Sequence, residues 1–93
     1  MTPANGPAEL TLLVAGESVT ARSARANLAA LIGAGVAEAE RVRVVDILEQ
    51  PAYALRYRVF FTPSLIVETP AGTTTIVGDL EELDRVKRLL ASV

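Results

Sequence analysis

Residues 10–15 form a short apolar run, Leu-Thr-Leu-Leu-Val-Ala, that ends at Gly16. A run of this length with little polar alternation indicates a strand that is buried on both faces. Strands of this kind occur in parallel sheets that helices cover on both sides. The run therefore predicts the central first strand of an α/β domain that begins near Glu9.

The segment that follows predicts a strand–helix–strand unit. Ser18 and Thr20 are candidate helix N-caps, and Gly33 and Gly35 indicate the end of the helix. Between them, apolar residues recur at helical spacing, namely Ala24, Leu28, Leu31 and Ile32. A β-branched stretch over residues 41–48 then predicts a second strand. Two strands joined in this way pair in parallel through a right-handed crossover.

The second half of the chain predicts a short helix and a hairpin. A proline is tolerated in the first turn of a helix, so Pro51 is compatible with a helix over residues 52–58. Strands over residues 65–68 and 73–77 flank a turn made by Pro70-Ala71-Gly72. We expect these two strands to pair antiparallel.

The last segment predicts an amphipathic helix. Asp79 is its expected cap, and Glu82 stands three residues later in capping-box position. One face of this helix is apolar and comprises Leu80, Leu83, Val86, Leu89 and Leu90. The predicted order is β-α-β-α-β-β-α, which is that of a thioredoxin-like α/β fold. We expect a disordered N-terminal tail over residues 1–8 and one domain over residues 9–93.

Composition excludes several classes of function. The 93-residue chain has no Cys and no His, which removes thiol nucleophiles, imidazole bases and the usual metal ligands, so we expect neither an enzyme nor a cofactor. Its nine basic residues are dispersed among eleven acidic ones, which argues against nucleic acid as a partner. The N-terminus lacks a secretion signal and no apolar stretch approaches the roughly 20 residues that cross a membrane, so we expect a cytoplasmic protein.

Four blocks of sequence together resemble the KaiB family of clock proteins. They are Leu13-Val14-Ala15-Gly16, Val45-Asp46-Ile47-Leu48 with Pro51, Thr62-Pro63-Ser64-Leu65, and Ile76-Val77-Gly78-Asp79-Leu80. The resemblance covers residues 10–90 and implies a protein that binds the KaiC ATPase ring, sequesters KaiA and displaces a histidine kinase. It also implies fold switching between a tetrameric ground state, βαββααβ, and a thioredoxin-like monomer.

The residues after Pro51 favour the thioredoxin-like state. KaiB proteins typically carry a run of prolines after the strand that follows Thr-Pro, whereas this chain has Pro70-Ala71-Gly72, a better hairpin turn. Residues 73–77 are strongly strand-prone, and the segment from Asp79 has high helix propensity. We therefore expect mainly a monomer, with a tetramer in the alternative fold.

The resemblance also suggests candidate site residues. Pro63 matches the thioredoxin-fold cis-proline, although a trans proline in a loop is the alternative. The position of the paired thioredoxin cysteines holds residues 16–20, Gly-Glu-Ser-Val-Thr, where thiol chemistry is impossible. Ser18, Thr20 and Ser23 lack a His to activate them, so helix capping explains them better than nucleophilic catalysis.

Charged and aromatic residues supply candidate partner contacts. Four arginines would form one face if the first helix lay beside the second strand, and in a KaiB-like protein this region helps to contact the ATPase; they are Arg22, Arg25, Arg43 and Arg58. A solvated surface explains them equally. Asp46 either takes part in binding or caps the following turn. We expect the aromatic residues to pack in the core and on the short helix, with one or two as partner anchors: Tyr53, Tyr57, Phe60 and Phe61.

The functional hypothesis is a KaiB-like module that docks on a KaiC-like ATPase, with a KaiA-like protein or a histidine kinase as further partners. One alternative is a stand-alone sensor module of a clock-type histidine kinase, and another is a stress-response adaptor. A thiol-dependent enzyme with a thioredoxin fold is disfavoured because the chain has no Cys. The loss of the proline run and of some family basic residues leaves the identity of the ATPase open.

Overall fold

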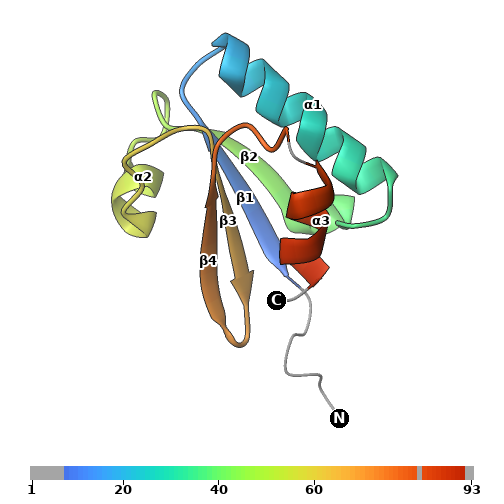
Figure 1. Ribbon diagram of the computed structural model, residues 1–93. Coiled ribbons are helices and arrows are strands. Elements are labelled where there is room, and N and C mark those ends of the chain that lie inside the picture. Colours follow the sequence, from blue (N-terminus) through green and yellow to red (C-terminus); the bar gives the residue numbers. More distant parts are fainter. Residues whose placement is uncertain (1–7, 82, 92–93) are drawn as a thin grey trace.

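A computed structural model describes residues 8–81 and 83–91. The chain forms a four-stranded sheet, and helices lie on both of its faces (Figure 1). The elements are β1 (Glu9–Val14), α1 (Val19–Gly33), a 3₁₀ turn η1 (Ala39–Arg41), β2 (Val42–Asp46), α2 (Ala52–Tyr57), β3 (Ser64–Thr69), β4 (Gly72–Val77) and α3 (Leu83–Ala91). The predicted β-α-β-α-β-β-α order is confirmed. The tail expected at residues 1–8 lies outside the described residues except for Ala8, which packs partly against the core.

The sheet has the strand order β2-β1-β3-β4. β1 pairs in parallel with β2, as the strand–helix–strand pattern predicts, and antiparallel with β3. β3 and β4 form the expected hairpin, in which Thr69 pairs with Gly72 across the two-residue turn Pro70-Ala71. β2 and β4 are therefore the two edge strands.

The larger core lies between the sheet and the helices α1 and α3, which cover the same face in Figure 1. β1 is the centre of this core, since Leu12 and Val14 are fully buried. The predicted apolar positions of α1 pack against it, and Val86 contributes from α3. Alternate residues of β1 point to the opposite face, where Leu13 joins Val45 and Ile66 in a smaller cluster under α2.

α2 is held on the smaller cluster by its two tyrosines. The ring centroids of Tyr53 and Tyr57 lie 6.4 Å apart, and the Tyr57 hydroxyl donates a 2.8 Å hydrogen bond to Oε1 of Glu68 on β3. The pKa of Tyr57 is raised above its usual 10.0, chiefly by burial and then by the hydrogen bond to Glu68 and the charge of Glu68. The positive charges of Arg56 and Arg43 act in the opposite direction. The hydroxyl of Tyr57 therefore stays protonated at neutral pH and ties α2 to the sheet.

The expectation that Asp79 caps the last helix is wrong. α3 begins at Leu83, and Leu80 has a left-handed backbone with φ 66° that turns its side chain into the core, where only 4% is exposed. The chain cannot be helical at Leu80, so Asp79 closes a local turn instead: its Oδ1 accepts a hydrogen bond from the Glu81 N–H at 3.2 Å. Glu82, the expected capping-box residue, lies outside the described residues.

Polar contacts fix this turn and the opposite end of the sheet. The side-chain amide of Asn27 on α1 donates a 2.9 Å hydrogen bond to the carbonyl of Asp79. At the other end, Arg41 forms ion pairs with Glu9 at 2.9 Å and with Glu38 at 3.2 Å.

Within the described part of the chain, no helix has the length and apolar character needed to span a membrane.

Candidate docking surface at the loop corner

Three loops meet where β1 and β2 end and β3 begins. They comprise residues 15–18, 47–51 and 58–63, and we call them together the loop corner. β1 and β2 run in parallel, so their carboxyl ends share one edge of the sheet, and β3 starts there because it runs antiparallel to β1. The order of the strands therefore brings together loops that are far apart in the sequence.

Asp46 holds two of these loops together. Its Oδ1 accepts a hydrogen bond from the N–H of Gly16 at 3.1 Å and another from the N–H of Leu48 at 2.9 Å. The N–H of Ile47 donates to the carbonyl of Val14 at 2.8 Å. Of the two functions expected for Asp46, the geometry supports the capping of the following turn, and adds a bridge to the first loop that the sequence did not reveal.

The β1–α1 loop contains no thiol, and its conformation is set by Gly16 and Ser18. Gly16 has φ +68°, a left-handed conformation that favours glycine. Ser18 is the N-cap of α1, since its Oγ accepts a hydrogen bond from the Ala21 N–H at 3.1 Å, while Thr20 lies inside the helix. Helix capping is thus the observed use of Ser18.

The α2–β3 loop contains a buried proline next to exposed rings. The Thr62–Pro63 peptide bond is cis, and the carbonyl of Pro63 accepts a 2.9 Å hydrogen bond from the Gly78 N–H at the end of β4. The hydroxyl of Ser64 donates to the carbonyl of Phe61 at 2.6 Å. These contacts hold the loop against both strands of the hairpin.

The expected packing is confirmed for Tyr53 and Tyr57 but wrong for the two phenylalanines. Phe60 is 87% exposed and Phe61 is 71% exposed. The reason lies just before them: Arg58 ends α2 in a left-handed conformation with φ 55°, and Val59 then fills the smaller cluster. The next two rings follow this residue directly and stay outside the cluster.

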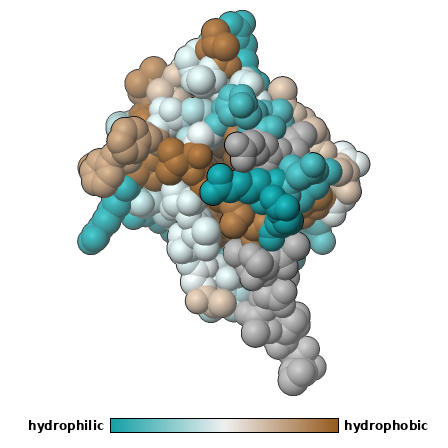
Figure 2. Space-filling view, in the orientation of Figure 1, coloured by the Kyte–Doolittle hydropathy of each residue, from teal (hydrophilic) through white to brown (hydrophobic). Residues whose placement is uncertain are grey.

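Other large apolar side chains are exposed as well. Val77 at the end of β4 is 62% exposed and lines, with Phe60 and Phe61, a shallow groove of about 170 Å³. Leu48 and Leu55 are 71% and 81% exposed. Figure 2 shows hydrophobic colour gathered on the lobe at the α2 side of the molecule. Exposed apolar surface of this extent, with large aromatic side chains, is typical of contact sites for other proteins.

The four candidate arginines do not form one face. Arg22 and Arg25 lie on α1, and Nη2 of Arg25 lies 3.7 Å from Oε1 of Glu17 in the loop corner. Arg43 pairs with Thr11 in the sheet and shares the face of Leu13 and Val45, on which α2 lies. Arg58 is the exposed C-cap of that helix. The sheet therefore separates Arg43 from Arg22 and Arg25, contrary to the expectation.

The donor groups in the described ranges do not form a metal site, because no three acidic side chains gather there. Asp46 is engaged by backbone N–H groups, and Glu68 by Tyr57. The loop corner thus exposes Leu48, Phe60 and Phe61 beside charged residues that include Glu17, Glu49 and Arg58. Hydrogen bonds to backbone groups hold its loops in place.

The model of the KaiB domain family matches residues 11–92. The chain is 31% identical over 77 residues to the circadian clock protein KaiB3 of Synechocystis sp., a match that covers 83% of this chain and 76% of that protein.

Solved structures with a similar fold include the N-terminal domain of SasA from Synechococcus elongatus, with a TM-score of 0.68 and 22% identity over 97% of this chain and 84% of that one. The thioredoxin Deadhead of Drosophila melanogaster has a TM-score of 0.72 and 12% identity, and the match covers 94% of this chain and 81% of that one. The thioredoxin-like fold expected from the sequence is confirmed.

Proposed function

This chain belongs to the KaiB family, and we propose that it is a non-catalytic cytoplasmic protein that binds a KaiC-type ATPase ring and regulates its clock or signalling output. One observation carries the proposal: Phe60 and Phe61 are exposed beside Pro63, at the corner where a thioredoxin holds its thiols. A chain without Cys has no redox use for this corner. Its use is therefore to present apolar surface to a partner.

The loop corner has the composition of a protein contact site. Aromatic and arginine side chains contribute most to binding energy at protein interfaces, and here both kinds are exposed on a supported loop. Arg58 lies in the same loop as the two phenylalanines, while Arg22 and Arg25 extend the surface along α1. We assign these three arginines to the rim of the contact, and Asp46 to positioning its loops. Arg43 lies outside it, because it stands near the start of β2 whereas the loop corner follows the end of that strand.

We assign binding to the thioredoxin-like state, as a monomer. In the alternative fold, βαββααβ, the segment of α3 would become a strand and the chain would form a tetramer. Backbone chemical shifts of residues 83–91 distinguish the two states in solution: helical shifts support binding by the thioredoxin-like state, and strand shifts contradict it.

A size-exclusion titration tests the function. The chain is mixed with a KaiC-type ATPase from the same source, at concentrations through the micromolar range, and a complex is expected. The double variant Phe60→Ala with Phe61→Ala should lose the complex, whereas Glu40→Ala, an exposed change in η1 at the other end of the sheet, should keep it. Absence of a wild-type complex throughout this range contradicts the proposal.

A second candidate function is a sensor module of a clock-type histidine kinase, favoured by the similarity to the SasA domain over 97% of the chain. A competition experiment distinguishes the two candidate functions. A KaiB-like protein should displace the histidine kinase from the ATPase ring and capture a KaiA-like protein there. A sensor module should instead increase autophosphorylation when it is fused to the kinase domain and the ATPase is added.

A further inference from the structure

The two edges of the sheet differ in how they are protected. The edge strand β2 carries Arg43 and Asp46, and charges of this kind discourage pairing with another strand. The edge strand β4 reads Gly-Thr-Thr-Thr-Ile-Val and carries no charge and no proline. Thr73, Thr74, Thr75 and Val77 are exposed. β4 is therefore an unprotected edge with strongly strand-prone residues.

The free backbone groups of β4 can be assigned from its pairing with β3. The N–H of Gly78 donates to the carbonyl of Pro63, and backbone groups of residues two apart in a strand point to the same side. Thr74 and Ile76 thus pair with β3, consistent with the register that places Ile76 opposite Leu65. The N–H and C=O groups of Thr73, Thr75 and Val77 point to the free edge.

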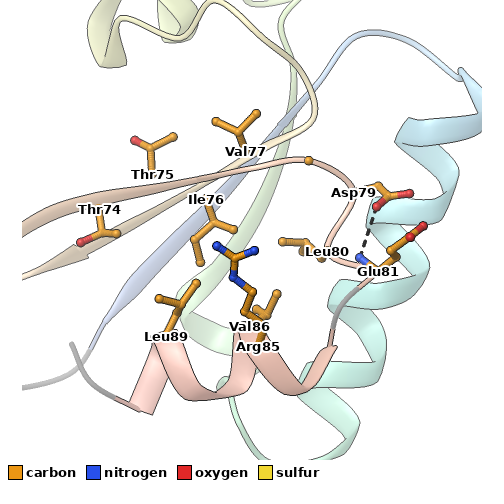
Figure 3. Close-up of a pocket in the computed structure, with 11 residues that line it drawn as sticks. Thr74, Thr75, Ile76, Val77, Asp79, Leu80, Glu81, Arg85, Val86 and Leu89 are labelled. Atoms are coloured by element: carbon orange, nitrogen blue, oxygen red, sulfur yellow. Dashed lines mark hydrogen bonds between the residues drawn. The ribbon is translucent and has the colours of Figure 1, made fainter.

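Grooves flank this edge on both faces of the sheet. On the α3 side, a groove of about 420 Å³ lies between β4 and the helix. Figure 3 shows Ile76 pointing into it, towards Val86 and Leu89, while Thr75 and Val77 point to the other face. On that other face Thr75 and Val77 line the smaller groove beside Phe61. An added strand would place alternate side chains in the two grooves, as in recognition by strand addition.

We propose that this edge pairs with β4 of a second copy of the chain, so that two sheets join into one across a two-fold axis. The free backbone pattern is self-complementary: all three outward residues pair in the antiparallel register that places Thr75 opposite Thr75 of the second copy, and Thr73 opposite Val77. Opposed threonines also form favourable cross-strand pairs.

The charges of the strands and turns do not oppose a second copy in this antiparallel orientation. In this register Arg58, which lines the groove at the Val77 end, faces the hairpin turn of the other copy. That turn, residues 69–72, is Thr-Pro-Ala-Gly and carries no charge. No two like charges of the strands or turns are therefore opposed, whereas a parallel arrangement would bring the Arg58 ends together. Because the smaller groove includes Phe60 and Phe61, self-association and binding at the loop corner compete for these rings.

Analytical ultracentrifugation of the full chain, from micromolar to millimolar concentration, tests the proposal. The wild type should pass from monomer to a species of twice that mass. Thr75→Lys and Thr75→Glu should each raise the dissociation constant of the dimer about fivefold or more, because like charges then meet at the two-fold axis. An equimolar mixture of the two variants should restore pairing. Glu40→Lys, a charge change in η1, should leave the dimer unchanged.

A wild type that remains monomeric at millimolar concentration overturns the proposal, and so does a mixture of the Lys and Glu variants that pairs no better than either alone. Hydrogen exchange provides a check that needs no variant: the outward N–H groups of Thr73, Thr75 and Val77 should become protected as the concentration rises. Exchange of these three groups that is independent of concentration contradicts pairing through β4.

Discussion

The carboxylate of Asp46 accepts a hydrogen bond from the backbone N–H of Gly16 at 3.1 Å, across thirty positions of the chain. The same oxygen also accepts from the N–H of Leu48 at 2.9 Å. One side chain at the end of β2 therefore fixes both the β1–α1 loop and the turn that leads to α2. The shape of the loop corner depends on this carboxylate.

Replacing Asp46 by alanine should destabilise the protein by about 1–3 kcal/mol, because two backbone N–H groups lose an acceptor. Asp46→Asn is the matched control: it keeps one acceptor oxygen and should cost clearly less. Urea unfolding followed by circular dichroism measures both changes. Equal stability of the alanine variant and the wild type would show that water replaces the carboxylate without loss.

Gly16→Ala should destabilise the fold by about 1–2 kcal/mol, because an L-residue is strained at φ +68°. Space is a smaller factor, since the added Cβ would lie at an ordinary 3.4 Å from Cδ1 of Leu48. The control is Gly33→Ala at the end of α1, where the φ is not positive and a Cβ would meet no atom within 4 Å. The control should be neutral or slightly stabilising by the same unfolding measurement.

Ser18→Ala should cost about 1 kcal/mol, because the Ala21 N–H loses its capping acceptor. The sequence allowed either Ser18 or Thr20 as the cap, and the structure assigns Ser18. Thr20→Ala is thus the control: Thr20 is exposed in the first turn, alanine has the higher helix propensity, and stability should hold or rise. If thermal unfolding shows a larger loss of stability for Thr20→Ala than for Ser18→Ala, Ser18 is not the N-cap of α1.

Much of the fold could be predicted from local sequence patterns. Periodicity and glycine positions identified α1, and the fully buried run of β1 identified the centre of the sheet. The start of α3 could not be predicted, because Leu80 adopts a left-handed conformation to reach the core, and tertiary packing here overrides the capping signal of Asp79.

The loop corner was harder to predict than the fold. The bridge from Asp46 to Gly16 depends on two strands lying side by side, which no local pattern encodes. The exposure of Phe60 and Phe61 follows from the end of α2 at Tyr57 and the burial of Val59, so hydrophobicity alone placed both rings incorrectly. The separation of Arg43 from Arg22 reflects the alternation of side chains along β2.

Tyr57 should make the protein sensitive to alkaline pH. Its pKa in the folded state is raised above 10.0, chiefly by burial and then by Glu68, so the folded state holds this proton more tightly than the unfolded state. The stability it contributes is complete below pH 10 and is lost as the pH rises through the folded pKa. In a Tyr53→Phe background the ultraviolet absorbance of tyrosinate reports Tyr57 alone.

In that titration Glu68→Gln should lower the pKa of Tyr57 towards 10.0, because a negative charge next to the hydroxyl is removed. Above pH 10 the wild type should also lose stability relative to Tyr57→Phe, because phenylalanine has no hydroxyl proton to lose. If Tyr57 titrates at the same pH in folded and urea-unfolded protein, the hydrogen bond to Glu68 has no influence on its ionisation.

Phe60 and Phe61 should matter for binding and not for stability. Both rings are mostly exposed, so Phe60→Ala and Phe61→Ala should each change the free energy of unfolding by no more than about 0.5 kcal/mol. Leu13→Ala, which shortens a fully buried side chain of the smaller cluster, should cost about 2–5 kcal/mol of stability.

If the loop corner contacts a KaiC-type ATPase, at least one phenylalanine variant should weaken that complex by about 2 kcal/mol, or about thirtyfold in Kd by titration calorimetry. Unchanged affinity in both variants would remove the loop corner from the interface even if the ATPase binds elsewhere.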